Sequence, residues 1–295
     1  MSTALTVPKA APRIGLIVTG ESTIQDFTVF IKTLELWHPT AILYVASDST
    51  PKIIHKTKLT IQIRTMLDDY SGKSRKEMEG IPGKIYKTLW TDFMYEKAAV
   101  LEWMASDVGS SDEMLWFLDA DIVHAGPLPT VPEGKTVVLS PHRIRESDEA
   151  RYGHYNGGFL GIRANKCQEV LAVWRFAGTN TETTGRFYEQ SALEAVAEYA
   201  KDTLYELPSS VNFGWWRMYQ SSMSSAEIQK RFRFNRTATG IGLLYEDKPI
   251  QSFHTHISDK SDMIAAMFNW WLNELTKKFE SHKPCSSWRR AVGWS

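Results

Sequence analysis

Two short apolar runs, separated by a segment of helical periodicity, constrain the fold most strongly. The first run is "IGLIVT" (14–19) and the second is "AILYVAS" (41–47). Between them, four apolar residues recur at the spacing of one helical face: Phe27, Phe30, Ile31 and Leu34. Runs of this length predict buried strands, and a strand–helix–strand unit predicts a parallel sheet with covered faces. We therefore expect an α/β fold.

The rest of the chain continues this alternation. Further strands are predicted at 113–120, 136–140 and 157–162. Further helices are predicted at about 91–106, 165–176, 187–201 and 261–280. Residues 50–90 are basic and show no clear periodicity, and "DDYSGKSRKEMEG" (68–80) within them predicts an exposed loop.

The last predicted helix carries an apolar stripe, which predicts a buried face. Its members are Ile264, Met267, Phe268, Trp271, Leu272, Leu275 and Phe279. Because Trp271 belongs to this stripe, the pair Trp270-Trp271 is expected in the core. For the chain as a whole, we expect a flexible arm at 1–12 and one domain at 13–295. The half at 13–125 is of the nucleotide-binding type, and the half at 126–295 is mixed α/β.

The composition limits the class of protein. The 295 residues are 43% hydrophobic, which is enough for a large core. The 34 basic and 34 acidic residues balance, so charge gives no indication of nucleic-acid binding. Two cysteines imply no disulfide framework. Without a signal-peptide core or a long apolar run, we expect no transmembrane segment and a cytoplasmic location.

The stretch "LWFLDADIVHAGPLP" (115–129) contains the clearest candidate site. Its apolar strand ends in Asp119 and Asp121, and residues two apart in an extended chain face the same side. In open α/β sheets, ligands bind beyond the carboxyl ends of the strands. Two carboxylates this close repel each other unless a cation lies between them. The pair therefore predicts a Mg²⁺ or Mn²⁺ site that carries a phosphate ligand.

Two other interpretations of this triplet stay open. A solvated aspartate pair at a turn explains an isolated Asp-x-Asp equally well. The sequence from Asp119 to Val123 also resembles the strand end of haloacid-dehalogenase-type phosphatases, in which the first aspartate, here Asp119, is the nucleophile. Three predicted elements precede this strand, however, and the later acidic residues follow no strong apolar strand. Both features disfavour the phosphatase.

Several short motifs in a fixed order over residues 14–260 resemble the metal-dependent glycosyltransferases of the GT-A fold. The resemblance is closest to the retaining glycogenin and lipopolysaccharide-galactosyltransferase family. The matching residues are Lys97, Asp119-Ala-Asp121, Asn156-Gly157-Gly158, Glu189-Gln190 (where the family usually has Asp-Gln), His254 and Lys260. The resemblance implies a GT-A-type Rossmann-like sheet merged with a mixed acceptor-side region. It also implies transfer of a hexose-type sugar, with retention, from a nucleotide diphosphate donor such as a UDP-sugar to a glycan or glycoconjugate hydroxyl.

The same resemblance assigns roles at the metal and the donor. Asp119, Asp121 and His254 are expected to hold Mn²⁺ or Mg²⁺, as in the family. His256 is a rival ligand, because residues two apart in an extended segment share a side. The residues expected to contact the donor are Thr19, Gly20, Glu21, Asp48, Lys97, Asp119, Ala120, Asn156, Gly157, Gly158 and Lys260.

Catalytic and acceptor residues are expected farther along the chain. The resemblance implies that Glu189 and Gln190 lie at the reacting face of the sugar. The helical pattern points Glu189 inward. Asn212, Trp215 and Trp216 are candidates for the acceptor site, although core packing is the alternative for both tryptophans. Other functions that stay open are an inverting transferase and a non-catalytic protein that binds a sugar nucleotide or a glycan.

Overall fold

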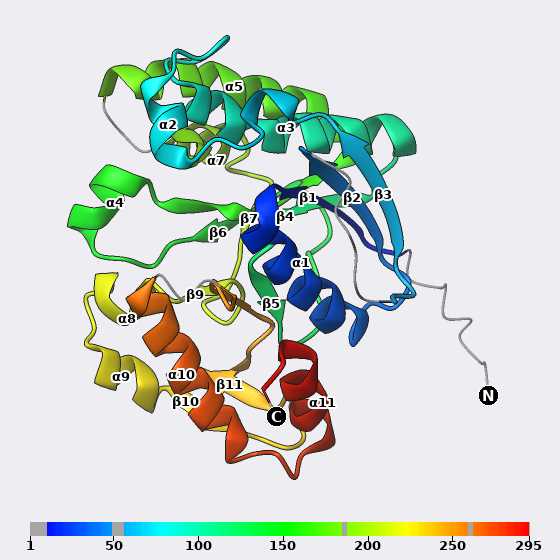
Figure 1. The fold of residues 1–295 in the computed structure, drawn as a ribbon, viewed down its shortest axis with the longest axis vertical. Helices are drawn as coiled ribbons and strands as arrows, with labels where there is room; N and C mark the ends of the chain where they lie inside the picture. The colour runs from blue at the N-terminus through cyan, green and yellow to red at the C-terminus, as the bar shows by residue number, and fades with distance from the viewer. Residues whose placement is uncertain (1–10, 49–55, 185–187, 259–261, 295) are drawn as a thin grey trace.

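The computed structural model describes residues 11–48, 56–184, 188–258 and 262–294. A central sheet of seven strands runs through the molecule, with helices on both faces (Figure 1). Its strands are β1 (Arg13–Val18), β2 (Ile42–Ser47), β3 (Thr60–Thr65), β4 (Met114–Leu118), β6 (Val137–Pro141), β7 (Tyr155–Arg163) and β8 (Leu204–Glu206). The predicted α/β class is confirmed.

The sheet has the order β3-β2-β1-β4-β7-β6-β8. The first four strands are parallel to one another, as the opening strand–helix–strand pattern predicts. Beyond β4, strand β7 runs antiparallel to both of its neighbours, so the second half of the sheet is mixed. The carboxyl ends of β1, β2 and β4 consequently meet at one edge, where α/β sheets bind ligands.

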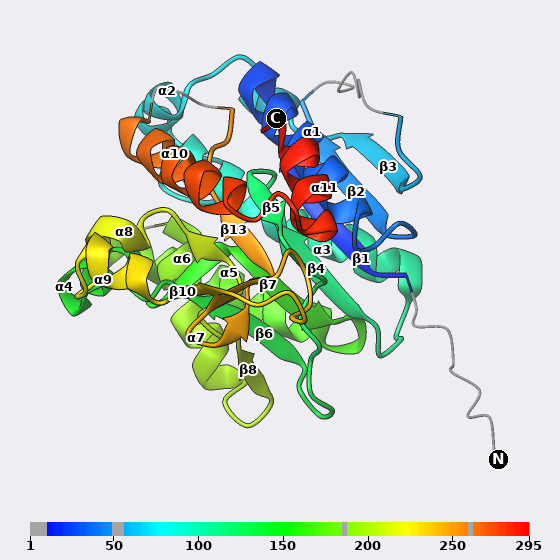
Figure 2. The same ribbon diagram turned by 90° about the horizontal axis from the view of Figure 1, so that it is seen from below.

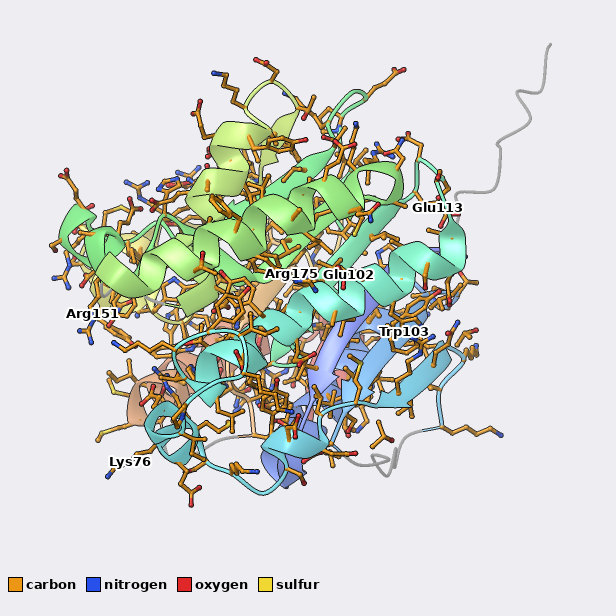
Figure 3. The ribbon with its side chains drawn as sticks, turned by 90° about the horizontal axis from the view of Figure 1, so that it is seen from above. Lys76, Glu102, Trp103, Glu113, Arg151 and Arg175 are labelled. Carbon is orange, nitrogen blue, oxygen red and sulfur yellow. The ribbon has the colours of Figure 1, made fainter. Side chains whose placement is uncertain are left out.

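Two helical layers cover the sheet. On one face lie α3 (Leu89–Val108), α5 (Cys167–Thr184) and α7 (Leu193–Tyr199). Figure 3 shows α3 and α5 side by side, joined by an ion pair between Arg175 and Glu102. The opposite face is covered by α1 (Gly20–Glu35), which packs against α11 (Lys283–Val292) (Figure 2).

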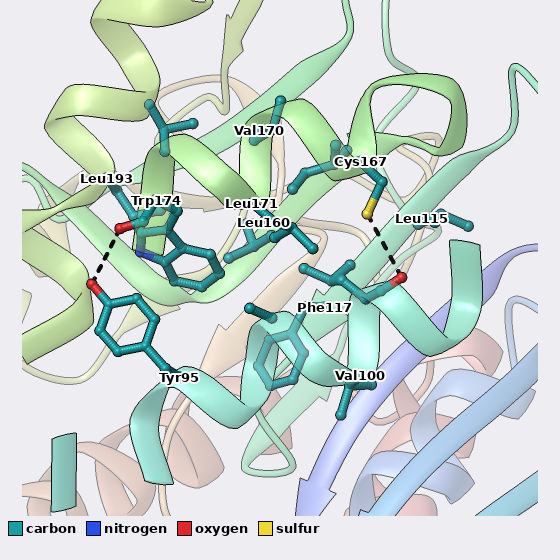
Figure 4. Close-up of a cluster of buried hydrophobic side chains, with 14 of the residues drawn as sticks. Tyr95, Val100, Leu115, Phe117, Leu160, Cys167, Val170, Leu171, Trp174 and Leu193 are labelled. Carbon is teal, nitrogen blue, oxygen red and sulfur yellow. Dashed lines mark hydrogen bonds between the residues drawn. The ribbon is translucent and has the colours of Figure 1, made fainter. Parts of the chain in front are cut away.

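Strand β4 is buried on both faces, which explains its continuous apolar sequence. Leu115 and Phe117 face the α3–α5 side, where Trp174 and Leu171 pack in the same cluster (Figure 4). Trp116 and Leu118 face the α1 side. The two aspartates that follow β4 are therefore held at the end of a strand that packing fixes on both faces.

The C-terminal region adds two small sheets and a third apolar cluster. One sheet contains β5 (Ile122–His124), β13 (Ser252–His254) and β9 (Phe213–Gly214). The other contains β10 (Phe232–Phe234), β11 (Leu243–Tyr245) and β12 (Lys248–Pro249). Helices α10 (Met263–Lys277) and α11 pack against them around Phe253, Phe268 and Trp288. The remaining helical elements are η1 (Asp68–Tyr70), α2 (Arg75–Gly80), α4 (Glu146–Tyr152), η2 (Ala164–Lys166), α6 (Tyr188–Ser191), α8 (Arg217–Gln220) and α9 (Ser225–Lys230).

Two local predictions are wrong. The predicted loop at 68–80 contains η1 and α2, and α2 begins with a capping box in which Ser74 and Glu77 exchange hydrogen bonds. The apolar stripe of α10 is only partly buried. Its members Ile264 and Met267 are exposed, as is Trp270, because no described element packs on that side of the helix. Phe268 and Leu272 are buried as predicted.

Within the described residues, no helix combines the length and apolar character that a membrane span requires. Both cysteines, Cys167 and Cys285, are buried and free.

Candidate active site

The chain leaves β4 through a tight connection that presents both aspartates. The backbone N–H of Asp119 donates to Gly158 O on β7 at 2.8 Å, and Ile122 N–H donates to Asp119 O at 3.2 Å. Residues 122–124 then form β5, which pairs with β13 in a register that places Ile122 opposite His254. This pairing brings a histidine from late in the chain beside the Asp-x-Asp turn.

Asp119, Asp121 and His254 form a compact group of possible metal ligands. Their ligand atoms all lie within 4.8 Å of one another. His254 Nε2 lies 3.1 Å from Asp121 Oδ1 and 3.9 Å from Asp119 Oδ2. Two carboxylates and one imidazole are a suitable ligand set for Mn²⁺ and are compatible with Mg²⁺. We refer to these three residues as the Asp–Asp–His group.

The backbone of β7 leaves space for this group. A Cβ atom on Gly158 would lie 2.2 Å from Asp119 Oδ2 and 2.5 Å from His254 Cε1. Any side chain at this position would therefore displace two of the three candidate ligands. The close approach explains why glycine occupies position 158.

His256 contacts the same aspartate from another direction. Its Nδ1 lies 3.1 Å from Asp121 Oδ2, whereas His254 faces Oδ1. The compact group contains His254, and His256 is 39% exposed at its side chain and lines a cavity. This geometry favours His254 as the candidate metal ligand. His256 lies next to the group, in the lining of the cavity.

Charges within the group support one another. Burial alone would raise the pKa of Asp121, but His254 and His256 hold it well below its usual range. Burial lowers the pKa of His254, but Asp121 outweighs this effect and raises it above its usual value. Asp121 and His254 thus each favour the charged form of the other.

Lys97 connects this group with Glu189. Its ammonium lies 3.4 Å from Asp119 Oδ1, donates to Glu189 Oε1 at 3.0 Å and donates to Gly157 O at 3.1 Å. Burial lowers the pKa of Lys97, but Asp119 and Glu189 raise it above its usual value, so the side chain stays charged. Glu189 is fully buried, as its predicted inward direction requires, and its Oε2 has no hydrogen-bond partner among the described residues.

Amide side chains surround the other side of the group. Asn212 is fully buried, and its Oδ1 lies 3.0 Å from His254 Nδ1. Asn212 Nδ2 donates to Asn156 Oδ1 at 3.0 Å, and Asn156 Nδ2 donates to Gln190 Oε1 at 3.2 Å. The structure therefore brings three of the predicted polar residues into one network that reaches His254.

A cavity of about 760 Å³ opens beside these residues. Eight of the predicted donor-binding or metal-binding residues line it: Thr19, Gly20, Asp48, Lys97, Asp119, Ala120, Asp121 and His256. They come from the ends of β1, β2 and β4, from α3 and from the segment after β13. The other predicted residues that are described lie outside the cavity lining: Asn156, Gly157, Gly158, Glu189, Gln190, Asn212, Trp215, Trp216 and His254.

Two predictions lie outside what is described. Lys260 belongs to the residues that the structure does not describe, and the same holds for the side chain of Glu21. Their predicted contacts with the donor stay predictions.

The two candidate acceptor tryptophans differ in environment. Trp216 is 9% exposed, donates to His142 O at 3.3 Å and stands edge-on to His254 at 5.0 Å between ring centroids. Trp215 is partly buried and lies 6.2 Å from the His256 ring. Trp215 is thus the more accessible of the two.

Sequence reasoning missed a carboxylate on α1. Asp26 lines the cavity and accepts from Ser258 N–H at 2.9 Å. Burial raises the pKa of Asp26 to about 6, with a further increase from Asp121, although the bond from Ser258 lowers it. The signal was present in the helical pattern, because Asp26 precedes Phe30 by one turn on the buried face of α1.

A second missed feature is the wall formed by the segment around α2. Tyr70, Lys73, Arg75 and Trp90 line the same cavity as the aspartates. The wall is held in place by Tyr70, whose hydroxyl donates to Glu96 at 2.7 Å and whose ring packs against Phe93. No local pattern in the basic segment 50–90 indicated this position.

No protein family model and no curated protein matches the chain in sequence. Among solved structures, the chain is similar to the apo form of mouse xyloside xylosyltransferase 1, with 11% identity and a TM-score of 0.49. That likeness covers 82% of this chain and 97% of the other. At this level it carries no argument about function.

Proposed function

We propose that the protein is a metal-dependent glycosyltransferase of the GT-A type. It would move a hexose-type sugar from a nucleotide diphosphate donor to an acceptor hydroxyl. The observation that carries the proposal is the Asp–Asp–His group at the carboxyl end of β4, beside a cavity of about 760 Å³. Both carboxylates line that cavity, and so do the cationic side chains of Lys73, Arg75 and Lys97. This arrangement suits a nucleoside diphosphate bound together with a divalent cation.

Asp119, Asp121 and His254 would hold Mn²⁺ or Mg²⁺. When bound, the ion would supply Lewis-acid stabilisation of negative charge on the diphosphate oxygens. Lys97 would add a fixed positive charge on the same side, and Lys260 would do so from the segment after His256. Thr19, Gly20 and Asp48 would bind the nucleoside, with Asp48 suited to accept from ribose hydroxyls.

The sugar would lie toward β7 and α6. The free Oε2 of Glu189 is a buried acceptor that lacks a partner among the described residues, and a sugar hydroxyl could satisfy it. Gly157 and Gly158 leave room for the side chains of Glu189 and of the Asp–Asp–His group, while Asn156 and Gln190 offer amide groups. Glu189 would stabilise positive charge on the sugar ring as the bond to the diphosphate breaks.

The proposed reaction retains the anomeric configuration. The acceptor oxygen would form a bond to the anomeric carbon on the face from which the diphosphate oxygen departs. Its proton would pass to that departing oxygen, so no separate strong base is required. Trp215 and Trp216 would contribute to the acceptor site, as flat rings suited to a sugar face. The geometry of Asn212 suits a supporting role better, because its amide already contacts His254, Asn156 and Ser140.

The proposal is tested by incubating the protein with a panel of nucleotide-sugars, UDP-hexoses first, and glycan acceptors. We expect transfer or slow donor hydrolysis with Mn²⁺, none with a chelator and none in Asp121→Ala. Nuclear magnetic resonance of the product decides between retention and inversion. Equal activity in the presence of chelator would contradict the metal-dependent mechanism.

Two other outcomes would replace the proposal. Release of phosphate from simple phosphomonoesters, with a covalent acyl-phosphate on Asp119, would identify a phosphatase. Calorimetric binding of a donor without turnover on any acceptor would identify a sugar-nucleotide-binding or glycan-binding protein.

A further inference from the structure

A continuous chain of side-chain amides connects the candidate metal site with the proposed sugar site. It runs from the His254 ring through Asn212 and Asn156 to Gln190, with contacts of 3.0, 3.0 and 3.2 Å. We call this the amide chain. Asn212, Asn156 and His254 are all buried, so water does not compete with these bonds.

Two glycine backbone N–H groups fix the direction of every bond in the amide chain. Gly158 N–H donates to Asn156 Oδ1 at 3.0 Å, and Gly157 N–H donates to Gln190 Oε1 at 3.1 Å. A backbone N–H can only donate, so both contacted atoms are oxygens. The Asn212 atom that faces Asn156 Oδ1 must therefore be its NH₂ group.

The same logic reaches the imidazole. If Asn212 turns its NH₂ toward Asn156 and Ser140, its oxygen faces His254 Nδ1. Nδ1 must then carry the hydrogen. In the neutral ring this leaves Nε2 as a lone pair directed toward Asp121 and Asp119, which is the state that a metal ligand requires.

Hydrogen bonds to the backbone of Asn212 fix the position from which its side chain contacts His254. Asn212 has a left-handed φ of 52°, which asparagine tolerates better than most residues. Its N–H donates to Ser252 Oγ at 2.9 Å. The buried guanidinium of Arg217 donates to Asn212 O at 3.1 Å and to Ser209 O at 2.7 Å. The acceptor for His254 is thus in place before any ligand binds.

We infer that Asn212 is a positioning residue for His254, and that the amide chain couples metal binding to the sugar site through Gln190. Gly157 and Gly158 set the polarity of the chain and thereby the tautomer of His254. The inference rests on the proposed function for the identity of the two sites. The direction of the hydrogen bonds does not depend on it.

The first test measures Mn²⁺ affinity by calorimetry. Asn212→Ala removes the acceptor and should weaken Mn²⁺ binding about 10- to 100-fold, the range for residues that orient a metal-ligating histidine. Asn212→Asp keeps an oxygen acceptor for Nδ1 and should restore most of the affinity. Thr276→Val, which removes a buried hydroxyl on α10, is the control for general loss of stability. Unchanged affinity in Asn212→Ala would overturn the positioning role.

The second test addresses coupling. Gln190→Leu should weaken Mn²⁺ binding about 2-fold or more, although Gln190 is no metal ligand, because residues that share one network couple at least this strongly. The double variant with Asn212→Ala should lose little beyond Asn212→Ala alone. Strictly additive losses would refute the coupling and leave the positioning role standing.

The third test needs no metal. Nitrogen-15 spectra of histidine-labelled protein distinguish the two neutral tautomers, and the chain has only 8 histidines to assign. At alkaline pH, His254 should carry its hydrogen on Nδ1 in the wild type and lose this preference in Asn212→Ala. The opposite tautomer in the wild type would refute the inference. Absence of Mn²⁺ binding by wild-type protein with the expected tautomer would instead count against the proposed function.

Discussion

At the scale of single residues, Gly158 is a position where a Cβ atom has no room beside the candidate ligands. We predict that Gly158→Ala abolishes Mn²⁺ binding, because the added Cβ would lie 2.2 Å from Asp119 Oδ2. Gly80→Ala is the matched control, since a Cβ there meets nothing within 4 Å. Calorimetry measures the Mn²⁺ affinity of both variants. Unchanged affinity in Gly158→Ala would show that the metal ligands lie elsewhere.

Asp121 contacts two histidines, His254 through Oδ1 and His256 through Oδ2. Asp121→Asn should reduce Mn²⁺ affinity by more than about 100-fold, the upper end for residues that only orient a ligand. The losses of Mn²⁺ affinity in Asp121→Asn and in His254→Asn should both exceed the loss in His256→Asn. Asp121 and His254 belong to the compact group of possible ligands, and His256 does not. Asp112→Asn, an exposed carboxylate paired with Arg163, serves as the control. A larger loss in His256→Asn than in His254→Asn would assign the ligand to His256.

At the scale of the element, strand β5 contains a buried histidine that the site does not use. Burial lowers the pKa of His124 to about 3, and its Nε2 has no partner within the described part of the chain. The unfolded chain therefore takes up a proton near pH 6.5, whereas the folded protein does so only near pH 3. The contribution of neutral His124 to the free energy of unfolding is therefore fully present above pH 6.5 and decreases as the pH falls toward 3.

We predict that His124→Phe weakens this dependence on pH. Between about pH 6 and 4, His124 should lower the free energy of unfolding by about 1.4 kcal/mol per pH unit. Phenylalanine keeps the edge-on contact with Phe30 and cannot take up a proton. Urea unfolding at pH 7 and pH 5 gives the free energy of unfolding of each protein at both pH values. An equal decrease from pH 7 to pH 5 in wild type and variant would contradict the role of His124.

At the scale of the whole molecule, the candidate ligands join two parts of the fold. Asp119 and Asp121 follow β4 of the seven-stranded sheet, and His254 belongs to β13 of a small C-terminal sheet. A bound ion would hold these parts together only in the folded protein. Mn²⁺ at 100 times its dissociation constant should therefore raise the free energy of unfolding by about 2.7 kcal/mol. Urea titrations should show the increase in wild type, its reversal by chelator and no increase in Asp121→Asn.

The helices and strands of the first half could be predicted because their evidence is local. Strands β1, β2 and β4 are buried on both faces and have continuous apolar sequences, and α1 repeats its apolar residues every three to four positions. The loop prediction at 68–80 was wrong because η1 and α2 are short and are held mainly by contacts to α3. The exposed side of α10 failed for a related reason. Periodicity finds an apolar stripe but does not show whether a partner covers it.

The sequence by itself determined the class of the fold, the placement of two aspartates at a strand end and the inward direction of Glu189. Each follows from the order and spacing of neighbouring residues. Only the tertiary structure decided which side chains meet those aspartates. Lys97 reaches Glu189 across 92 residues, and Asp26 binds Ser258 across 232. Such contacts depend on strand order, on the register of β5 with β13 and on backbone N–H groups whose directions exist only in the folded chain.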